Sequence, residues 1–97
     1  MTARRKLSNR RGNVSIGFEY EGHKYRATAG YFADDGTLAE IFLHVPGRLG
    51  TPLQSNADNA AILASLLLQH NVPPEIIRHS VSGPIAIALS EFSEGER

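Results

Sequence analysis

Five basic side chains stand among the first eleven residues, and no acidic residue stands among them. Arginine and lysine neutralise phosphate groups and hydrogen-bond their oxygens, so this cluster could bind a nucleic acid. The chain holds ten basic and ten acidic residues, which leaves Gly12 to Arg97 with five basic residues against ten acidic ones. The sequence therefore predicts a basic arm, either as a nucleic-acid contact or as a solubilising tail. The residues that would contact nucleic acid are Arg4, Arg5, Lys6, Arg10 and Arg11.

A second group combines one aromatic ring with charged side chains. Phe42, Glu40 and His44 fall on one face of a predicted strand, and Arg26 falls on the same face of a neighbouring predicted strand. Opposite charges across strands usually form register-setting pairs on a solvated surface. An aromatic residue among them can instead anchor a protein partner. We therefore place the predicted protein-partner contact at Phe42, Glu40, Arg26 and His44.

The sequence offers no motif for catalysis or metal binding. It has no phosphate-binding loop, no nucleophile elbow, no zinc-binding H-E-x-x-H helix and no cysteine. Glu40 and His44 lie about 13 Å apart along an extended strand, too far for a direct acid–base pair. The histidines form no i, i+4 pair; they are His23, His44, His70 and His79. We expect no enzyme activity, no catalytic residue, no metal and no cofactor.

The element that must position these side chains is a predicted helix from Asn56 to Asn71. From Ala60 to Leu68 it is apolar at every position except Ser65. A helix that is apolar nearly all round is normally buried, so we expect protein on at least two of its sides. Ser55 and Asp58 have the spacing of a capping box at its start. The run is too short and too rich in alanine to span a membrane.

Three earlier segments alternate apolar and polar residues, which is typical of half-buried strands. They are Val14–Tyr20, His23–Phe32 and Thr37–Val45. Glu21-Gly22 and Asp34-Asp35-Gly36 supply the hairpin turns between them. The three strands make an antiparallel meander whose apolar face needs a cover, and the central helix is the adequate candidate.

The end of the chain predicts one or two short helices. Asn71 suits the left-handed position after the central helix, with Val72 folding back onto Leu67. A short helix is expected over residues 74–80. A second begins near Ser82, carries one apolar stripe, and is expected on the side of the central helix away from the sheet. The predicted fold is α+β, with a disordered basic arm over 1–13, a single domain over 14–93 and a polar tail over 94–97.

The order of these features between Val14 and Val81 resembles the TSCPD domain. The resemblance is carried by Tyr25, Asp35–Phe42, Gly47, Gly50 and Ala64–Val72. The TSCPD domain is a small accessory domain at the C-terminal end of vitamin B12-dependent ribonucleotide reductases, and it also occurs alone in short bacterial proteins. This chain lacks the large barrel domain that carries the radical chemistry and the cysteine-bearing motif of the family. The resemblance thus implies an accessory module with no transferable catalytic residue.

Two functions follow as expectations. The first is a non-catalytic interaction or regulatory module that binds or inhibits a protein partner, for example a mobile-element inhibitor such as an anti-CRISPR protein. In this first function, the module could also form a homodimer. The second is a nucleic-acid-binding accessory protein that uses the basic arm. The resemblance implies a bacterial protein. The missing cysteines and the missing signal-peptide pattern lead us to expect a cytoplasmic protein without a membrane partner.

Overall fold

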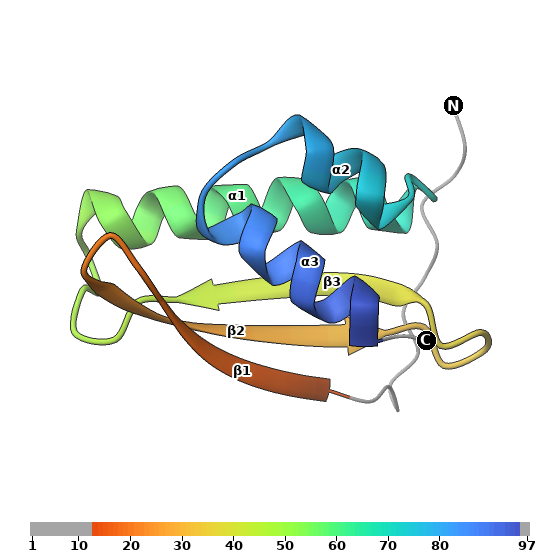
Figure 1. Ribbon diagram of the computed structural model, residues 1–97, viewed down its shortest axis with the longest axis horizontal. Helices are drawn as coiled ribbons and strands as arrows, with labels where there is room; N and C mark the ends of the chain where they lie inside the picture. The colour runs from red at the N-terminus through yellow and green to blue at the C-terminus, as the bar shows by residue number, and fades with distance from the viewer. Residues whose placement is uncertain (1–12, 96–97) are drawn as a thin grey trace.

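The computed structural model describes residues 13–95 and the side chains of residues 13–93. Three strands form one antiparallel sheet in the order β1-β2-β3, and three helices follow along the chain (Figure 1). The elements are β1 (Asn13–Tyr20), β2 (His23–Tyr31), β3 (Leu38–His44), α1 (Pro52–Gln69), α2 (Pro74–Ser80) and α3 (Pro84–Gly95). This confirms the predicted α+β fold. Within residues 13–95, each helix is too short or too polar to cross a membrane.

The hairpin between β1 and β2 follows the predicted turn chemistry. Glu21 and Gly22 adopt positive φ angles of 51° and 82°, which two-residue hairpins require to match the strand twist. The turn sets a register in which Phe18 lies opposite Tyr25. Their rings stack with centroids 5.4 Å apart on the face of the sheet that meets the helices. Alternation and turn type, both local signals, were therefore sufficient to predict this half of the sheet.

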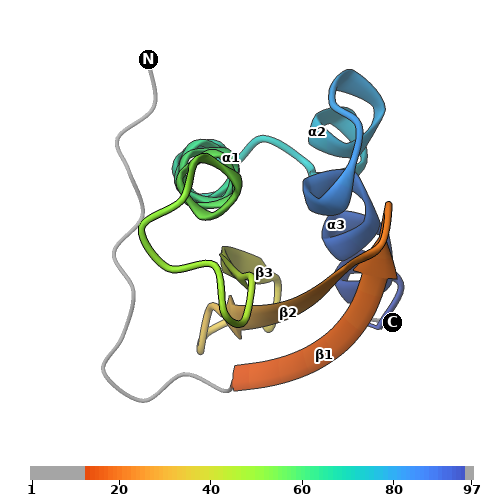
Figure 2. The ribbon, with the colours of Figure 1, turned by 90° about the vertical axis from the view of Figure 1, so that its left-hand side faces the viewer.

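Helices α1 and α3 form a second layer on one face of the sheet, and α2 packs mainly on α3. Figure 2 shows α1 and α3 side by side above the strands, with α1 over β3. The prediction that the last helix lies on the side of α1 away from the sheet is wrong, because α3 contacts β2 and β3 as well as α1. A helix about 10 Å across covers about two strands spaced 4.8 Å apart, so the rest of the apolar face needs a second helix. The buried residues of α3 are Ile85, Ala88, Leu89 and Phe92.

Helix α1 begins four residues earlier than predicted, and its cap is a different residue. Thr51 is the N-cap, and its hydroxyl accepts the backbone N–H of Gln54 at 3.4 Å. Pro52 occupies the first helical position, where a missing N–H costs nothing. The predicted capping box at Ser55 is wrong because Ser55 already lies inside the helix. At the other end the prediction is confirmed, since Asn71 has a φ of 69° and Val72 donates its N–H to the Leu67 carbonyl at 3.0 Å.

Candidate protein-interaction site

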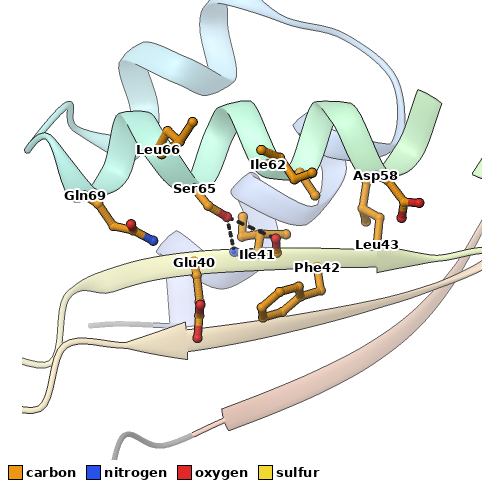
Figure 3. Close-up of a pocket in the computed structure, with 10 residues that line it drawn as sticks. Glu40, Ile41, Phe42, Leu43, Asp58, Ile62, Ser65, Leu66 and Gln69 are labelled. Atoms are coloured by element: carbon orange, nitrogen blue, oxygen red, sulfur yellow. Dashed lines mark hydrogen bonds between the residues drawn. The ribbon is translucent and has the colours of Figure 1, made fainter. Parts of the chain in front are cut away.

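Helix α1 is fastened to β3 by hydrogen bonds from its polar side chains. β3 is an edge strand of the described sheet, so one row of its backbone groups faces α1 instead of a further strand. The Ser65 hydroxyl accepts the N–H of Ile41 at 2.9 Å and donates to the Ile41 carbonyl at 3.1 Å (Figure 3). The Gln69 amide donates to the Ala39 carbonyl at 3.1 Å. These bonds satisfy edge groups that would otherwise be open to another strand.

Gln54 makes the corresponding bonds at the other end of β3. Its amide oxygen accepts the N–H of Val45 at 2.7 Å, and its amide nitrogen donates to the Leu43 carbonyl at 3.1 Å. The same nitrogen also donates to the carboxylate of Asp58 at 2.7 Å. Both Gln54 and Gln69 are buried. The spacing of Gln54, Ser65 and Gln69 places them on one side of α1. This shared side is the sequence signal for the packing of α1 on β3. The apolar residues between them obscure it.

The residues that α1 buries against the sheet are mostly small. Ala57, Ala61 and Ala64 are each at most 8% exposed, and Leu68 completes the row. Alanine holds the helix axis close to the strand, which lets the short Ser65 side chain reach the backbone of β3. A leucine at these positions would hold the helix farther from the strand. The small buried side chains therefore allow the hydrogen bonds between α1 and the edge strand β3 to form.

The hydrogen bonds between α1 and β3 also leave four large side chains of α1 exposed. Ile62 is 56% exposed, Leu63 63%, Leu66 36% and Leu67 44%. We call these four residues the α1 patch. The prediction of protein on at least two sides of this helix is confirmed, because α1 contacts β3, α2 and α3. The α1 patch nevertheless stays exposed, because the polar bonds to β3 fix which side of the helix faces inward. Hydrophobicity alone favours large side chains on the inward side, yet among Leu63, Leu66, Leu67 and Leu68 only Leu68 is buried there.

A groove joins the α1 patch to the outer side of the sheet. It lies between α1 and the edge of β3, has a volume of about 440 Å³, and is lined by Phe42, Ile62 and Leu66 among others (Figure 3). Phe42 is 55% exposed. Ile62 and Leu66 belong to both the patch and the groove, so the predicted partner residue Phe42 is continuous with an apolar surface that the sequence did not predict as a site.

The other predicted partner residues lie on the outer face of the sheet. Arg26 and His44 are exposed and directly opposite each other in the register of β2 and β3. Glu40 differs from its predicted surface role, because only 6% of it is exposed. Its carboxylate lies over Gly30, where a Cβ atom would stand 2.6 Å from Oε2 of Glu40. The missing side chain of Gly30 makes room for the carboxylate to fold onto the sheet.

The predicted nucleic-acid contacts Arg4, Arg5, Lys6, Arg10 and Arg11 lie outside the described residues. The described chain adds Lys24 and Arg26, which are both exposed on the outer face of β2.

Within residues 13–95, histidine and acidic side chains form no group of three or more that could hold a metal ion. Burial raises the pKa of the Tyr25 hydroxyl above its ordinary value of 10.0, with further contributions from Glu21 and Tyr20. Tyr25 is a core residue stacked on Phe18, so the raised pKa reflects packing.

No family model, no curated protein and no solved structure matches this chain. The resemblance to the TSCPD domain therefore stays a prediction, and the α1 patch with its groove is the feature on which a function can be argued.

Proposed function

We propose that this protein is a non-catalytic interaction module that binds a protein partner through the α1 patch and the adjacent groove. The observation that carries the proposal is the reversed burial of α1, which covers alanines and exposes four large aliphatic side chains. Burying one such side chain contributes about 1.5–3 kcal/mol, and the single chain forgoes part of this at all four positions. Contiguous apolar surfaces of this kind mark interaction sites on small proteins.

The charge pattern of α1 supports the same proposal. Asp58 is the only charged residue among its eighteen residues, and its carboxylate is bonded to Gln54 on the groove side. A helix face that contacts only water normally carries charged residues. An uncharged apolar face suits contact with another protein surface. We also propose that binding regulates or inhibits that partner, as expected from the sequence.

The experiment is a capture assay with a matched variant pair. The immobilised full chain is compared with Leu63→Asp, in the α1 patch, and with Leu49→Asp, in the loop before α1. Leu49 is 85% exposed, so both substitutions place a carboxylate on an exposed leucine. We expect the wild type and Leu49→Asp to retain a protein that Leu63→Asp does not retain. Retention of the same proteins by all three chains would contradict the proposal.

A second candidate function is nucleic-acid binding, and it is favoured by the exposure of Lys24 and Arg26 together with the basic arm. Its test is fluorescence anisotropy with labelled DNA and RNA. The full chain is compared with a chain starting at Gly12, whose fold is checked by circular dichroism. Binding by the full chain alone, with log K falling by about 0.7–0.9 per phosphate contact for each log unit of salt, would support it. Absence of binding by the full chain at low salt would exclude it.

A further inference from the structure

We infer that the partner of the α1 patch is a second copy of the same chain, with the two α1 helices packed antiparallel across a two-fold axis. The inference rests on the proposed function, because it names the occupant of that same surface. Three properties of the patch support a second copy: the symmetry of its spacing, its lack of charge and its ridge geometry.

The spacing of the patch is symmetric about its own centre. Ile62 and Leu67 lie equally far from the midpoint between Ala64 and Ser65, and so do Leu63 and Leu66. In an antiparallel pair with the two-fold axis at this midpoint, Ile62 faces the second copy's Leu67. Leu63 then faces the second copy's Leu66. A two-fold interface places one surface against itself, so it requires this kind of self-complementarity.

The symmetry extends beyond the four apolar residues. Asn59 and His70 flank the patch at equal distances from the same midpoint. In the antiparallel pair each end of the apolar contact is therefore bordered by an amide from one copy and an imidazole from the other. Apolar residues meet apolar residues, and polar residues meet polar residues, along three turns of the helix.

Charge favours a second copy over an unrelated partner. A two-fold contact places the patch against an identical patch, so a patch that carried charges of one sign would repel itself. The patch has no charged residue, and Asp58, the one charge of α1, lies on the groove side of the helix. A different protein partner is usually selected by complementary charges, and the patch offers none for that purpose.

The ridges of the patch define how the two helices would meet. Ile62 with Leu66, and Leu63 with Leu67, form two neighbouring i, i+4 ridges. When such ridges interdigitate, helices cross at about 50° with their axes about 8–10 Å apart. The contact then covers about two turns and buries less than the roughly 800 Å² per partner of a standard interface. We therefore expect a reversible dimer with a dissociation constant in the micromolar range.

Sedimentation velocity of the full chain tests the inference. The wild-type chain, at concentrations from about 1 µM to about 500 µM, should shift from the 10.6 kDa monomer to twice that mass. Leu63→Asp should raise the dissociation constant at least about tenfold, because two carboxylates would be buried at the contact. Leu49→Asp should dimerise like the wild type. Circular dichroism confirms that each variant is folded.

A crosslinking experiment tests the register. The chain has no cysteine, so single-cysteine variants report one position each. Mixed Leu63→Cys and Leu66→Cys chains should be joined by a short bismaleimide, whereas Leu49→Cys chains should not be joined to each other. Equal crosslinking of the mixed pair and of the Leu49→Cys control would overturn contact between two copies through the α1 patch.

The two proposals fail in distinguishable ways. A wild-type chain that stays monomeric at about 500 µM overturns the inference of a second copy. If such a chain still captures a different protein, and Leu63→Asp loses it, the proposed function stands with another occupant. A dimer that Leu63→Asp leaves unchanged also overturns the inference, because the contact then lies elsewhere on the molecule.

Discussion

The hydroxyl of Ser65 bonds both backbone groups of Ile41, accepting the N–H at 2.9 Å and donating to the carbonyl at 3.1 Å. This pair fixes the rotation of α1 about its own axis, because successive helical residues are 100° apart. With Ser65 turned toward β3, Leu63 and Leu67 lie about 160° away around the helix and point away from the sheet. Ile62 and Leu66 lie between these two directions and line the groove beside β3. The hydrogen bonds of Ser65 thus stabilise the fold and also determine which side chains of α1 are exposed to a partner.

We expect Ser65→Ala to lower the free energy of unfolding by about 1–3 kcal/mol. The substitution leaves two part-buried backbone groups of Ile41 without their partner. Urea denaturation measures the change. The control is Ser15→Ala, which removes an exposed bond between the hydroxyls of Ser15 and Thr28 and should change stability by less than about 0.5 kcal/mol. Equal effects of the two substitutions would contradict the role given to Ser65.

Substitutions at α1 should show that its buried alanines, and not the leucines of the α1 patch, stabilise the single chain. Ala61→Leu should cost about 1–3 kcal/mol, because Ala61 is 3% exposed and the added carbons push α1 away from β3. Leu63→Ala should change the free energy of unfolding by less than about 0.5 kcal/mol. Thermal unfolding at low protein concentration, where the chain is monomeric, measures both. A larger cost for Leu63→Ala would mean that the leucine packs within its own chain.

Gly30→Ala should be destabilising through Glu40. The new Cβ atom would stand 2.6 Å from Oε2 and 2.9 Å from Cγ of Glu40, so the buried carboxylate must move. We expect a cost of about 1–3 kcal/mol in urea denaturation. In the Glu40→Ala background the same substitution should cost less. Gly17→Ala is the matched control, because the nearest atom to its Cβ would be the Tyr25 carbonyl oxygen at 3.8 Å.

Thr51→Ala and Ser55→Ala distinguish the observed cap from the one predicted from sequence. Loss of the Thr51 side chain should lower stability by about 0.5–2 kcal/mol, because Thr51 is the N-cap of α1. Ser55 lies within the helix, and alanine is the better helix former there, so Ser55→Ala should be neutral or stabilising by up to about 0.5 kcal/mol. Thermal unfolding of both variants measures the difference, and the reverse order would restore Ser55 as the cap.

The strands and turns could be predicted because their signals are local. Alternating apolar residues and the positive-φ pair Glu21-Gly22 determine the first hairpin without reference to the rest of the chain. The left-handed conformation of Asn71, just after α1, is a local signal in the same sense. The predicted start of α1 at Asn56 is wrong because Pro52 begins the helix, and proline is favoured at a first helical position.

The candidate site could be predicted only in part, because it depends on contacts between distant segments. Alternation along β3 placed Phe42 on an exposed face. No local sequence signal shows which side of an apolar helix faces the sheet when one side carries alanines and another carries leucines. The decisive contacts join Ser65 to Ile41 and Gln54 to Val45, from different elements. The same limit applies to α3, whose position follows from the width of the sheet.

The measurement that tests the central claim most directly is methyl NMR of the full chain over a dilution series. If the α1 patch is the binding surface and a second copy is its occupant, the methyl signals that shift with concentration will be those of Ile62, Leu63, Leu66 and Leu67. Signals from the buried Leu89 and the exposed Leu49 will stay in place. Concentration-independent patch signals, or shifts centred on Leu49, would contradict the account.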